Sequence, residues 1–169
     1  MNNMMPGTLY LVLLPLLWVF TCLSACDSSQ QTAVEDVAKI KFAQHENQKV
    51  FGNYTIHVNT LTTDQLPPEV AREYKIARSK SKAMLNVVMT ENIDGVDKPV
   101  TGTVTTVARN LANQIKDMEM REIIEQDAIY YIGVISVDNE ENIIFDVEAT
   151  PANGSESFLM TYRQQFFTE

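Results

Sequence analysis

The sequence predicts a mainly β protein, an antiparallel β-sandwich of about seven strands with one short helix. Three observations support this prediction. Segments in which apolar and polar residues alternate recur along the chain, turn residues such as Asp94-Gly95 and Pro151-Ala152-Asn153-Gly154 separate them, and no long helical pattern lies between them. A parallel sheet would need such helices as crossovers, so the pattern argues against an α/β fold.

The first half of the predicted domain contains three strands and the helix. Apolar and polar residues alternate in 54–59 and in 85–90, and the Thr- and Val-rich stretch Val100–Arg109 fits a third strand, with Gly102 marking a bulge or a point of close approach. Within Leu66–Tyr74, Pro68 suits the first turn of a helix, and Glu69 is well placed near its N-terminus. We therefore expect one or two helical turns there, closing one end of the sandwich.

Four strands are predicted in the second half. Met118–Ile124 is the first, and Ala128–Val137 follows with apolar residues on both faces, which is typical of a central strand covered on both sides. The polar residues Asp138–Glu141 predict a hairpin turn into a strand over 143–149. The last strand carries three alternating apolar residues, Phe158, Met160 and Tyr162.

The N-terminal apolar run, Leu9–Phe20, is too short to span a bilayer, which needs about 20 apolar residues. Its length suits the apolar core of a signal peptide, and Leu23-Ser24-Ala25-Cys26 after it resembles the bacterial lipoprotein cleavage box. The chain therefore divides into a lipoprotein signal peptide at 1–25, a lipidated tether at 26–47 and a β-sandwich domain at 48–169. Because Met1–Thr8 lacks the usual Lys or Arg, an uncleaved N-terminal anchor helix is the alternative.

Cleavage before Cys26 would leave lipid on that cysteine and hold the protein in the cell envelope, facing the periplasm. Asp27 directly after it resembles an inner-membrane retention signal of enteric bacteria, which favours the inner membrane over the outer. The stretch Thr32–Phe42 fits either a short amphipathic helix near the lipid or a tether that contains a nascent helix or a first edge strand.

The formal net charge of the 169-residue chain is -9, and the first 25 residues contain no charged side chain, so the whole imbalance belongs to the mature part. An acidic protein repels phosphate backbones, which argues against nucleic-acid binding. The two cysteines are Cys22, inside the signal peptide, and the lipidated Cys26. We therefore expect a mature domain without disulfides, cysteine metal ligands or a cysteine nucleophile.

Short stretches of the domain carry a resemblance to a known family: Phe51–Tyr54, Leu66–Ala71, Arg78–Lys80, Ala83–Val87, Arg121–Ile123, Asp127–Ile132 and Gln165–Phe167. They are similar to domain of unknown function family 4426, a proteobacterial family of small exported proteins. The resemblance covers roughly Val50–Phe167 and implies an immunoglobulin-like sandwich in a periplasmic setting, but no activity. Many members look like plain secreted proteins, so the lipoprotein box is a departure from the family.

Positive charge gathers in Arg72–Lys82, which contains five basic residues and the single acid Glu73. Beside a lipid anchor, such a face could meet anionic headgroups or the cell wall, with each Lys or Arg contributing about 1 kcal/mol at an anionic surface. The alternative is a solvated strand edge that lysines protect from edge-to-edge pairing. Because loops on rigid sandwiches tend to carry function, we predict a partner surface formed by Tyr74, Arg78, Lys80 and Lys82.

No arrangement typical of an enzyme stands out in the sequence. Ser79-Lys80-Ser81-Lys82 matches the Ser-x-x-Lys spacing of penicillin-binding enzymes, but it precedes a strand and both partner motifs are missing. His57 could act as the base of a Ser-His-Asp triad, yet no Gly-x-Ser-x-Gly elbow is present to expose a serine.

Methionines raise the question of a copper site, because thioethers bind Cu(I) and Met118 and Met120 share one face of a predicted strand. Methionines also fill gaps in cores, and no histidine cluster accompanies them. The acidic residues of the turns follow no calcium-loop pattern. The sequence therefore predicts no metal and no cofactor.

The predicted function is that of a non-enzymatic, lipid-anchored bacterial envelope protein, which offers its sandwich to an unknown envelope protein or cell-wall partner. A periplasmic carrier of a small ligand or a metal is the main alternative. A hydrolase that uses His57 is less favoured.

Overall fold

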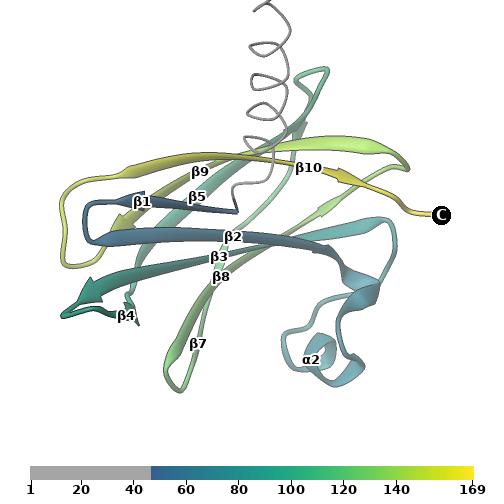
Figure 1. Ribbon diagram of the computed structural model, residues 1–169. Helices are drawn as coiled ribbons and strands as arrows, with labels where there is room; N and C mark the ends of the chain where they lie inside the picture. Colours follow the sequence, from purple (N-terminus) through teal and green to yellow (C-terminus); the bar gives the residue numbers. More distant parts are fainter. Residues whose placement is uncertain (1–46) are drawn as a thin grey trace, which may run out of the picture.

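The structure, a computed structural model, describes residues 47–169; the predicted signal peptide, Cys26 and the stretch Thr32–Phe42 lie outside the described residues. Within this range the chain forms two antiparallel sheets and one short α-helix (Figure 1). Side chains from both sheets share one hydrophobic core, so the sheets pack face to face. The predicted antiparallel β-sandwich is therefore confirmed.

The larger sheet has six strands, in the order β1-β2-β3-β8-β7, with β4 paired to the second half of β3. Its strands are β1 (Gln48–Phe51), β2 (Tyr54–Thr62), β3 (Lys82–Ile93), β4 (Val96–Pro99), β7 (Arg121–Glu125) and β8 (Ala128–Ser136). The connection from β2 to β3 contains a 3-10 turn, η1 (Thr63–Gln65), and the helix α2 (Pro68–Glu73).

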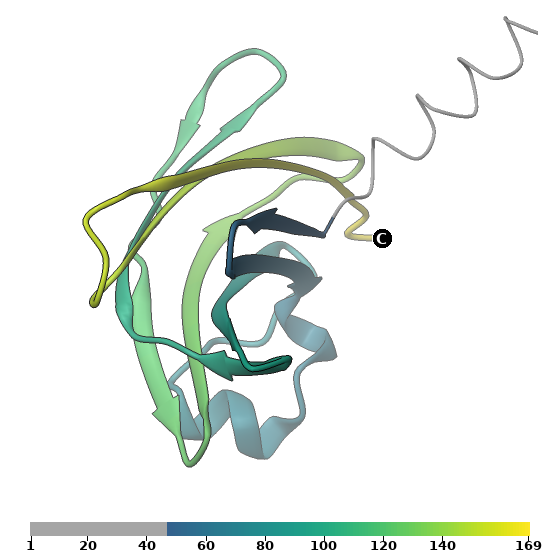
Figure 2. The same cartoon turned by 60° about the vertical axis from the view of Figure 1, so that its left-hand side comes forward.

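The smaller sheet has four strands, in the order β10-β9-β5-β6. They are β5 (Gly102–Asn110), β6 (Ile115–Lys116), β9 (Glu141–Pro151) and β10 (Phe158–Phe166). Figures 1 and 2 show β9 and β10 passing over β1 and β2 of the larger sheet. The rings of Phe51 in β1 and Phe158 in β10 stack there, with centroids 4.8 Å apart.

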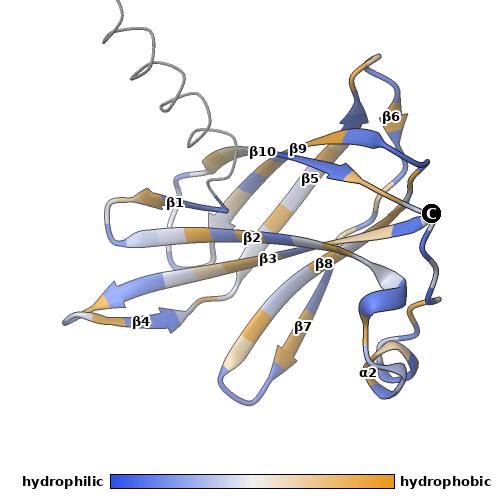
Figure 3. Ribbon diagram, turned by 45° about the vertical axis from the view of Figure 1, so that its right-hand side comes forward, coloured by the Kyte–Doolittle hydropathy of each residue, from blue (hydrophilic) through white to orange (hydrophobic). Residues whose placement is uncertain are grey.

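Alternation along the strands decides which side chains enter the core, and Figure 3 shows apolar and polar residues alternating along several of them. Ile56 of β2, Val87 of β3 and Phe145 of β9 are each 0% exposed. The ring of Phe145 lies between the sheets and meets the edge of Phe166 at 85°. This core holds the two sheets together and leaves the outer face of the larger sheet to be covered by another element.

Each of the seven predicted strand segments overlaps a strand of the structure, and Pro68 is at the first helical position of α2, as predicted. Three short strands, β1, β4 and β6, were not predicted. All three lie beside a single neighbour in their sheet. Their few residues carry little alternation of their own, so pairing with that neighbour is what makes them strands.

Three details of the prediction are wrong. Asp138–Glu141 is not a hairpin turn, because β8 belongs to the larger sheet and β9 to the smaller one, so this segment crosses between sheets. The strand predicted from Met118 begins only at Arg121. The helix does not close an end of the sandwich, because α2 packs on the outer face of the larger sheet.

The prediction that Ala128–Val137 contains a central strand covered on both sides is confirmed by β8. Tyr131 and Ile135 belong to the core between the sheets, whereas Ile132 packs with the α2 segment on the opposite face. The strand lies between β3 and β7, so both its faces and both its edges are covered. This burial explains why apolar residues occupy both faces of the strand.

A buried hydroxyl links the two sheets. The phenol of Tyr131, in a residue only 3% exposed, accepts a hydrogen bond from the backbone N–H of Gly102 in β5 (2.7 Å) and donates one to the Glu122 carboxylate in β7 (2.8 Å). Burial, followed by the hydrogen bond to Glu122, raises the pKa of the Tyr131 phenol to about 12. The predicted close approach at Gly102 is also confirmed, because a Cβ there would collide with the backbone carbonyl oxygen of Thr150.

Gly102→Ala should lower the free energy of unfolding by about 1–3 kcal/mol, because the added methyl group meets backbone that cannot yield. Gly154→Ala is the matched control, since a Cβ at that position has no neighbour closer than 3.6 Å. Thermal and denaturant unfolding of the full chain measure both variants. Equal stability of the two variants would contradict the close approach at Gly102.

Tyr131→Phe should lower the free energy of unfolding by about 1–2 kcal/mol at neutral pH, because Glu122 and the N–H of Gly102 lose their partner. The pKa of Tyr131 is raised from the model-peptide value of 10.0 to about 12, so its contribution is fully present below pH 10 and is lost between pH 10 and 12. Denaturant unfolding across this range should therefore show a shallower alkaline fall for Tyr131→Phe than for the wild type.

The control for this experiment is Tyr162→Phe, because among residues 47–169 the Tyr162 hydroxyl bonds only Gln164, which lies on the same strand (3.2 Å). It should keep nearly wild-type stability at neutral pH. A Tyr131→Phe protein with unchanged stability and an unchanged alkaline slope would show that this hydroxyl does not hold the sheets together.

Candidate functional site

The connection between β2 and β3, here called the α2 segment (residues 63–81), folds back against the outer face of the larger sheet. Leu66, Ala71 and Ile76 are buried there with Met84 of β3 and Ile132 of β8. This second hydrophobic cluster lies on the face of the sheet opposite the main core. The α2 segment is therefore held by apolar packing rather than left as a free loop.

Hydrogen bonds from Thr63, which is 0% exposed, close the base of the α2 segment. Its hydroxyl donates to the carbonyl of Ala77 (2.8 Å) and accepts from the N–H of Ser79 (2.9 Å). At the other end, the guanidinium of Arg121 in β7 donates to the carbonyl of Tyr74 (3.2 and 3.3 Å). The hydrogen bonds of Thr63 therefore close the segment on itself, those of Arg121 tie it to β7, and a space is left between the segment and the sheet.

That space is a pocket of about 190 Å³, here called the α2 pocket. It is open to solvent and lies between the α2 segment and strands β3, β7 and β8. Most of its wall is apolar and is formed by Leu66, Val70, Ile76, Met84, Ile123 and Ile132. Four further residues with polar groups complete the lining, namely Tyr74, Asn86, Tyr130 and Glu125.

Two polar atoms of the lining have no hydrogen-bond partner among residues 47–169, although solvent barely reaches them: the hydroxyl of Tyr74 and Oδ1 of Asn86. An unpaired buried polar group costs about 1–3 kcal/mol. Native structures pair nearly all such groups, so two of them in one apolar pocket mark a place where a bound group could supply the missing bonds. Glu125 is the one charged residue among the described lining residues, and its side chain is exposed.

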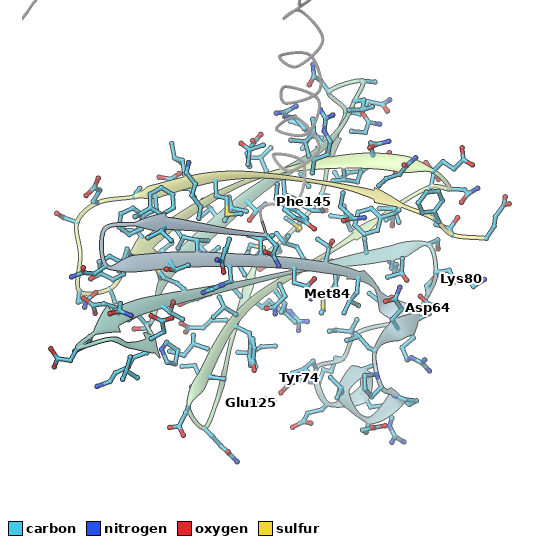
Figure 4. The ribbon with its side chains drawn as sticks, viewed as in Figure 1. Asp64, Tyr74, Lys80, Met84, Glu125 and Phe145 are labelled. Atoms are coloured by element: carbon cyan, nitrogen blue, oxygen red, sulfur yellow. The ribbon has the colours of Figure 1, made fainter. Side chains whose placement is uncertain are left out.

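The structure separates the four residues of the predicted partner surface. Tyr74 lines the α2 pocket, and Figure 4 shows it below the larger sheet together with Glu125. Arg78 is exposed, and its guanidinium donates to the carbonyl of Asp64. Lys80 lies at the far side of the α2 segment, away from Tyr74, and Lys82 begins β3. Only Tyr74 of the four therefore lines the pocket.

His57 lies on β2 with its side chain half-buried. Its Nε2 is 3.5 Å from the hydroxyl of Thr90 on β3. Among the described residues no serine or carboxylate forms a hydrogen bond with it. The geometry of a Ser-His-Asp triad is therefore not present in this part of the chain.

Met118 and Met120 lie close together, whereas Met84 lies apart from them. Met118 and Met120 lie over Gly133, where a Cβ would come within 2.7 Å of the Met118 side chain and the Met120 sulfur. They fill the space that glycine leaves beside the core, as methionines commonly do. Met84 is on the opposite face of the same sheet, in the α2 pocket.

Residues 47–169 contain no group of three or more His, Cys, Asp or Glu side chains placed to hold a metal ion. In the same range no helix is long and apolar enough to cross a membrane.

The sequence did not point to Asn86 or Glu125 as site residues. Asn86 was predicted only as a polar position of a strand, and the apolar residues that surround it come from distant parts of the chain. One hint was present, because Asn86 interrupts an otherwise apolar stretch, Ala83–Met89. The pocket itself arises from how β7 and the α2 segment flank β8, which alternation does not predict.

Comparison with protein families gives one result: the model of the family described as "Domain of unknown function (DUF4426)" matches residues 48–169. No curated protein matches the sequence.

Several solved structures are similar to this chain, and in two of them the match covers most of both chains. One is the crystal structure of a DUF4426 family protein from Pseudomonas aeruginosa PAO1, with 26% identity and a TM-score of 0.63 over 72% of this chain and 94% of that one. The other is FetP of uropathogenic E. coli strain F11, with 11% identity and a TM-score of 0.51 over 71% of this chain and 92% of that one. The likeness to FetP shows a shared fold alone.

Thr63→Val should lower the free energy of unfolding by about 1–3 kcal/mol, because it leaves the carbonyl of Ala77 and the N–H of Ser79 without the hydroxyl that joins them. Amide hydrogen exchange of residues 74–79 should speed up in this variant. Thr105→Val, on the exposed outer face of β5, is the control and should stay within about 0.5 kcal/mol of the wild type. Unchanged exchange in Thr63→Val would show that Thr63 does not close the segment.

Proposed function

This chain belongs to the DUF4426 family, whose description states no function, and we propose that it is a lipid-anchored bacterial envelope protein with a non-enzymatic binding domain. The α2 pocket is the binding site in this proposal. Lipid on Cys26 holds the domain at the membrane, facing the periplasm, and Asp27 favours the inner membrane.

One observation carries the proposal of a binding role: the α2 pocket combines an apolar wall with two polar atoms that lack partners. A few polar groups converging on an apolar pocket are the usual composition of a binding site. The volume of about 190 Å³ is small for a drug-sized ligand, so the pocket suits one compact group.

The envelope location rests on two observations. The cleavage box Leu23–Cys26 follows an apolar run of signal-peptide length. FetP, which shares the fold, was expressed recombinantly in the periplasm of E. coli. Residues 27–47 separate Cys26 from β1, and a chain of this length spans at most about 75 Å, so the domain can act at some distance from the membrane.

The basic side chains of the α2 segment provide a second, weaker contact in this proposal. Arg78 and Lys80 are exposed, and within residues 47–169 neither Lys80 nor Lys82 forms a salt bridge. Each could contribute about 1 kcal/mol at an anionic surface. They would orient the domain on the membrane or the cell wall, whereas the α2 pocket would select its ligand or partner.

A photo-crosslinking residue in place of Val70, at the pocket, tests the proposal in cells that produce the full-length protein. It should capture an envelope component, whereas the same residue in place of Leu159, 63% exposed on the other sheet, should not. In a Cys26→Ser protein the capture at position 70 should be lost, together with incorporation of a labelled fatty acid.

Capture at both positions to the same extent would mean that the crosslinks report exposure rather than binding. Fatty-acid labelling that persists in Cys26→Ser would overturn the proposed anchor. Capture at position 70 that does not depend on Cys26 would separate the binding role from the anchor and leave only the binding role.

A further inference from the structure

We propose that the α2 pocket binds a small hydrophobic amine, an ammonium group carried on a compact apolar body. This inference rests on the proposed function, because it takes the α2 pocket as the binding site and names the chemistry that the pocket selects. Three features of the pocket lead to it: the size of its apolar part, the kind of polar atom left unpaired, and the sign of its charge.

The apolar part of the pocket matches one ring with a short chain. Side chains from three strands and the α2 segment enclose about 190 Å³. An apolar cavity of about 150 Å³ can hold a benzene molecule. The α2 pocket is therefore large enough for a six-membered ring and one or two further carbon atoms, and too small for a long acyl chain.

The unpaired polar atoms call for a ligand that donates hydrogen bonds. Oδ1 of Asn86 is a carbonyl oxygen and only accepts, and the hydroxyl of Tyr74 can accept as well as donate. An ammonium group carries three donors and no acceptor, so one group can serve both atoms. A carboxylate offers only acceptors and would leave the Asn86 oxygen unpaired.

The charge of the pocket favours a cation. Glu125 is the one charged residue among the described lining residues, and among residues 47–169 it forms no salt bridge. The guanidinium of Arg121 in β7 already donates to the carbonyl of Tyr74, and Arg121 is not part of the lining. An ammonium in the pocket would therefore meet one carboxylate and no positive charge among the described lining residues.

Calorimetric titration of the full-length protein with three matched probes tests this inference: phenethylamine, 2-phenylethanol and phenylacetate. They share the apolar body and differ in the polar group. Phenethylamine should bind about tenfold more tightly than 2-phenylethanol, because charged hydrogen bonds are stronger than neutral ones. Phenylacetate should show no binding.

Variants of Asn86 and Glu125 test whether these two side chains bind the ammonium group. Asn86→Leu should weaken phenethylamine binding about tenfold without lowering the melting temperature, because it removes an unpaired buried oxygen and fills its place with an apolar group. Glu125→Gln should weaken the amine about threefold and leave 2-phenylethanol unchanged, as expected for an exposed ion pair. The control is Asn59→Leu, the same change at the residue paired with Asn86 on β2, and it should bind all probes as the wild type does.

An ammonium on an apolar body also occurs at the N-terminus of a peptide that begins with phenylalanine. A tripeptide of phenylalanine followed by two glycines separates this source from a free molecule. It should bind more weakly than phenethylamine, because its extra backbone exceeds the pocket. Tighter binding of the tripeptide would assign the pocket to a protein N-terminus and overturn the inference of a free amine.

Other outcomes separate the inference from the proposed function. Phenethylamine and 2-phenylethanol could bind with equal affinity, and Asn86→Leu could leave both affinities unchanged. This result would overturn the inference of an amine ligand and keep the pocket as a binding site. Preference for phenylacetate would overturn it too, because it would show that Asn86 offers its amide N–H groups. If no probe binds while position 70 still captures a partner, the amine inference fails and the proposed function stands; if neither occurs, both fail.

Discussion

The hydroxyl of the buried residue Tyr131 joins the two sheets. It accepts a hydrogen bond from the N–H of Gly102 in the smaller sheet and donates one to the carboxylate of Glu122 in the larger sheet. The bond is possible only because position 102 has no side chain, since a Cβ there would collide with backbone. Burial makes the bond strong and also makes its loss costly. This contact joins β5 of the smaller sheet to β7 and β8 of the larger one, beside the shared core around Phe145 that holds the two sheets together.

The same packing determines where a site can form. One face of the larger sheet is used by the shared core, so its other face needs a separate cover, and the α2 segment supplies it. That cover is closed on itself by Thr63 and tied to β7 at Tyr74, but it leaves the α2 pocket between itself and the sheet. An apolar residue in place of Asn86 would suit the sheet better. The polar residue there is consistent with stability given up for binding, a trade that functional sites often show.

The strands were predictable wherever the physical cause is local. In β2 and β10 buried residues largely alternate with more exposed ones, so alternation identifies these strands, and in β8 apolar residues on both faces reveal a strand covered on both sides. β4 and Asp138–Glu141 show where this fails. β4 is a strand because it pairs with β3, and a polar turn has the same composition whether it joins two strands of one sheet or crosses to the other. Tyr74 was predicted as a contact residue for its loop, whereas Glu125 becomes a neighbour of the pocket only through the pairing of β7 with β8.

By itself the sequence determined the class of fold, the family and the positions of most strands, because each of these rests on the order of apolar, polar and turn residues along the chain. The tertiary structure alone decided which strands share a sheet, that Tyr131 bridges the sheets at Gly102, and that Tyr74, Asn86 and Glu125 surround one pocket. These depend on contacts between residues far apart in the chain. Such contacts follow from how whole faces pack against one another, which no local pattern encodes.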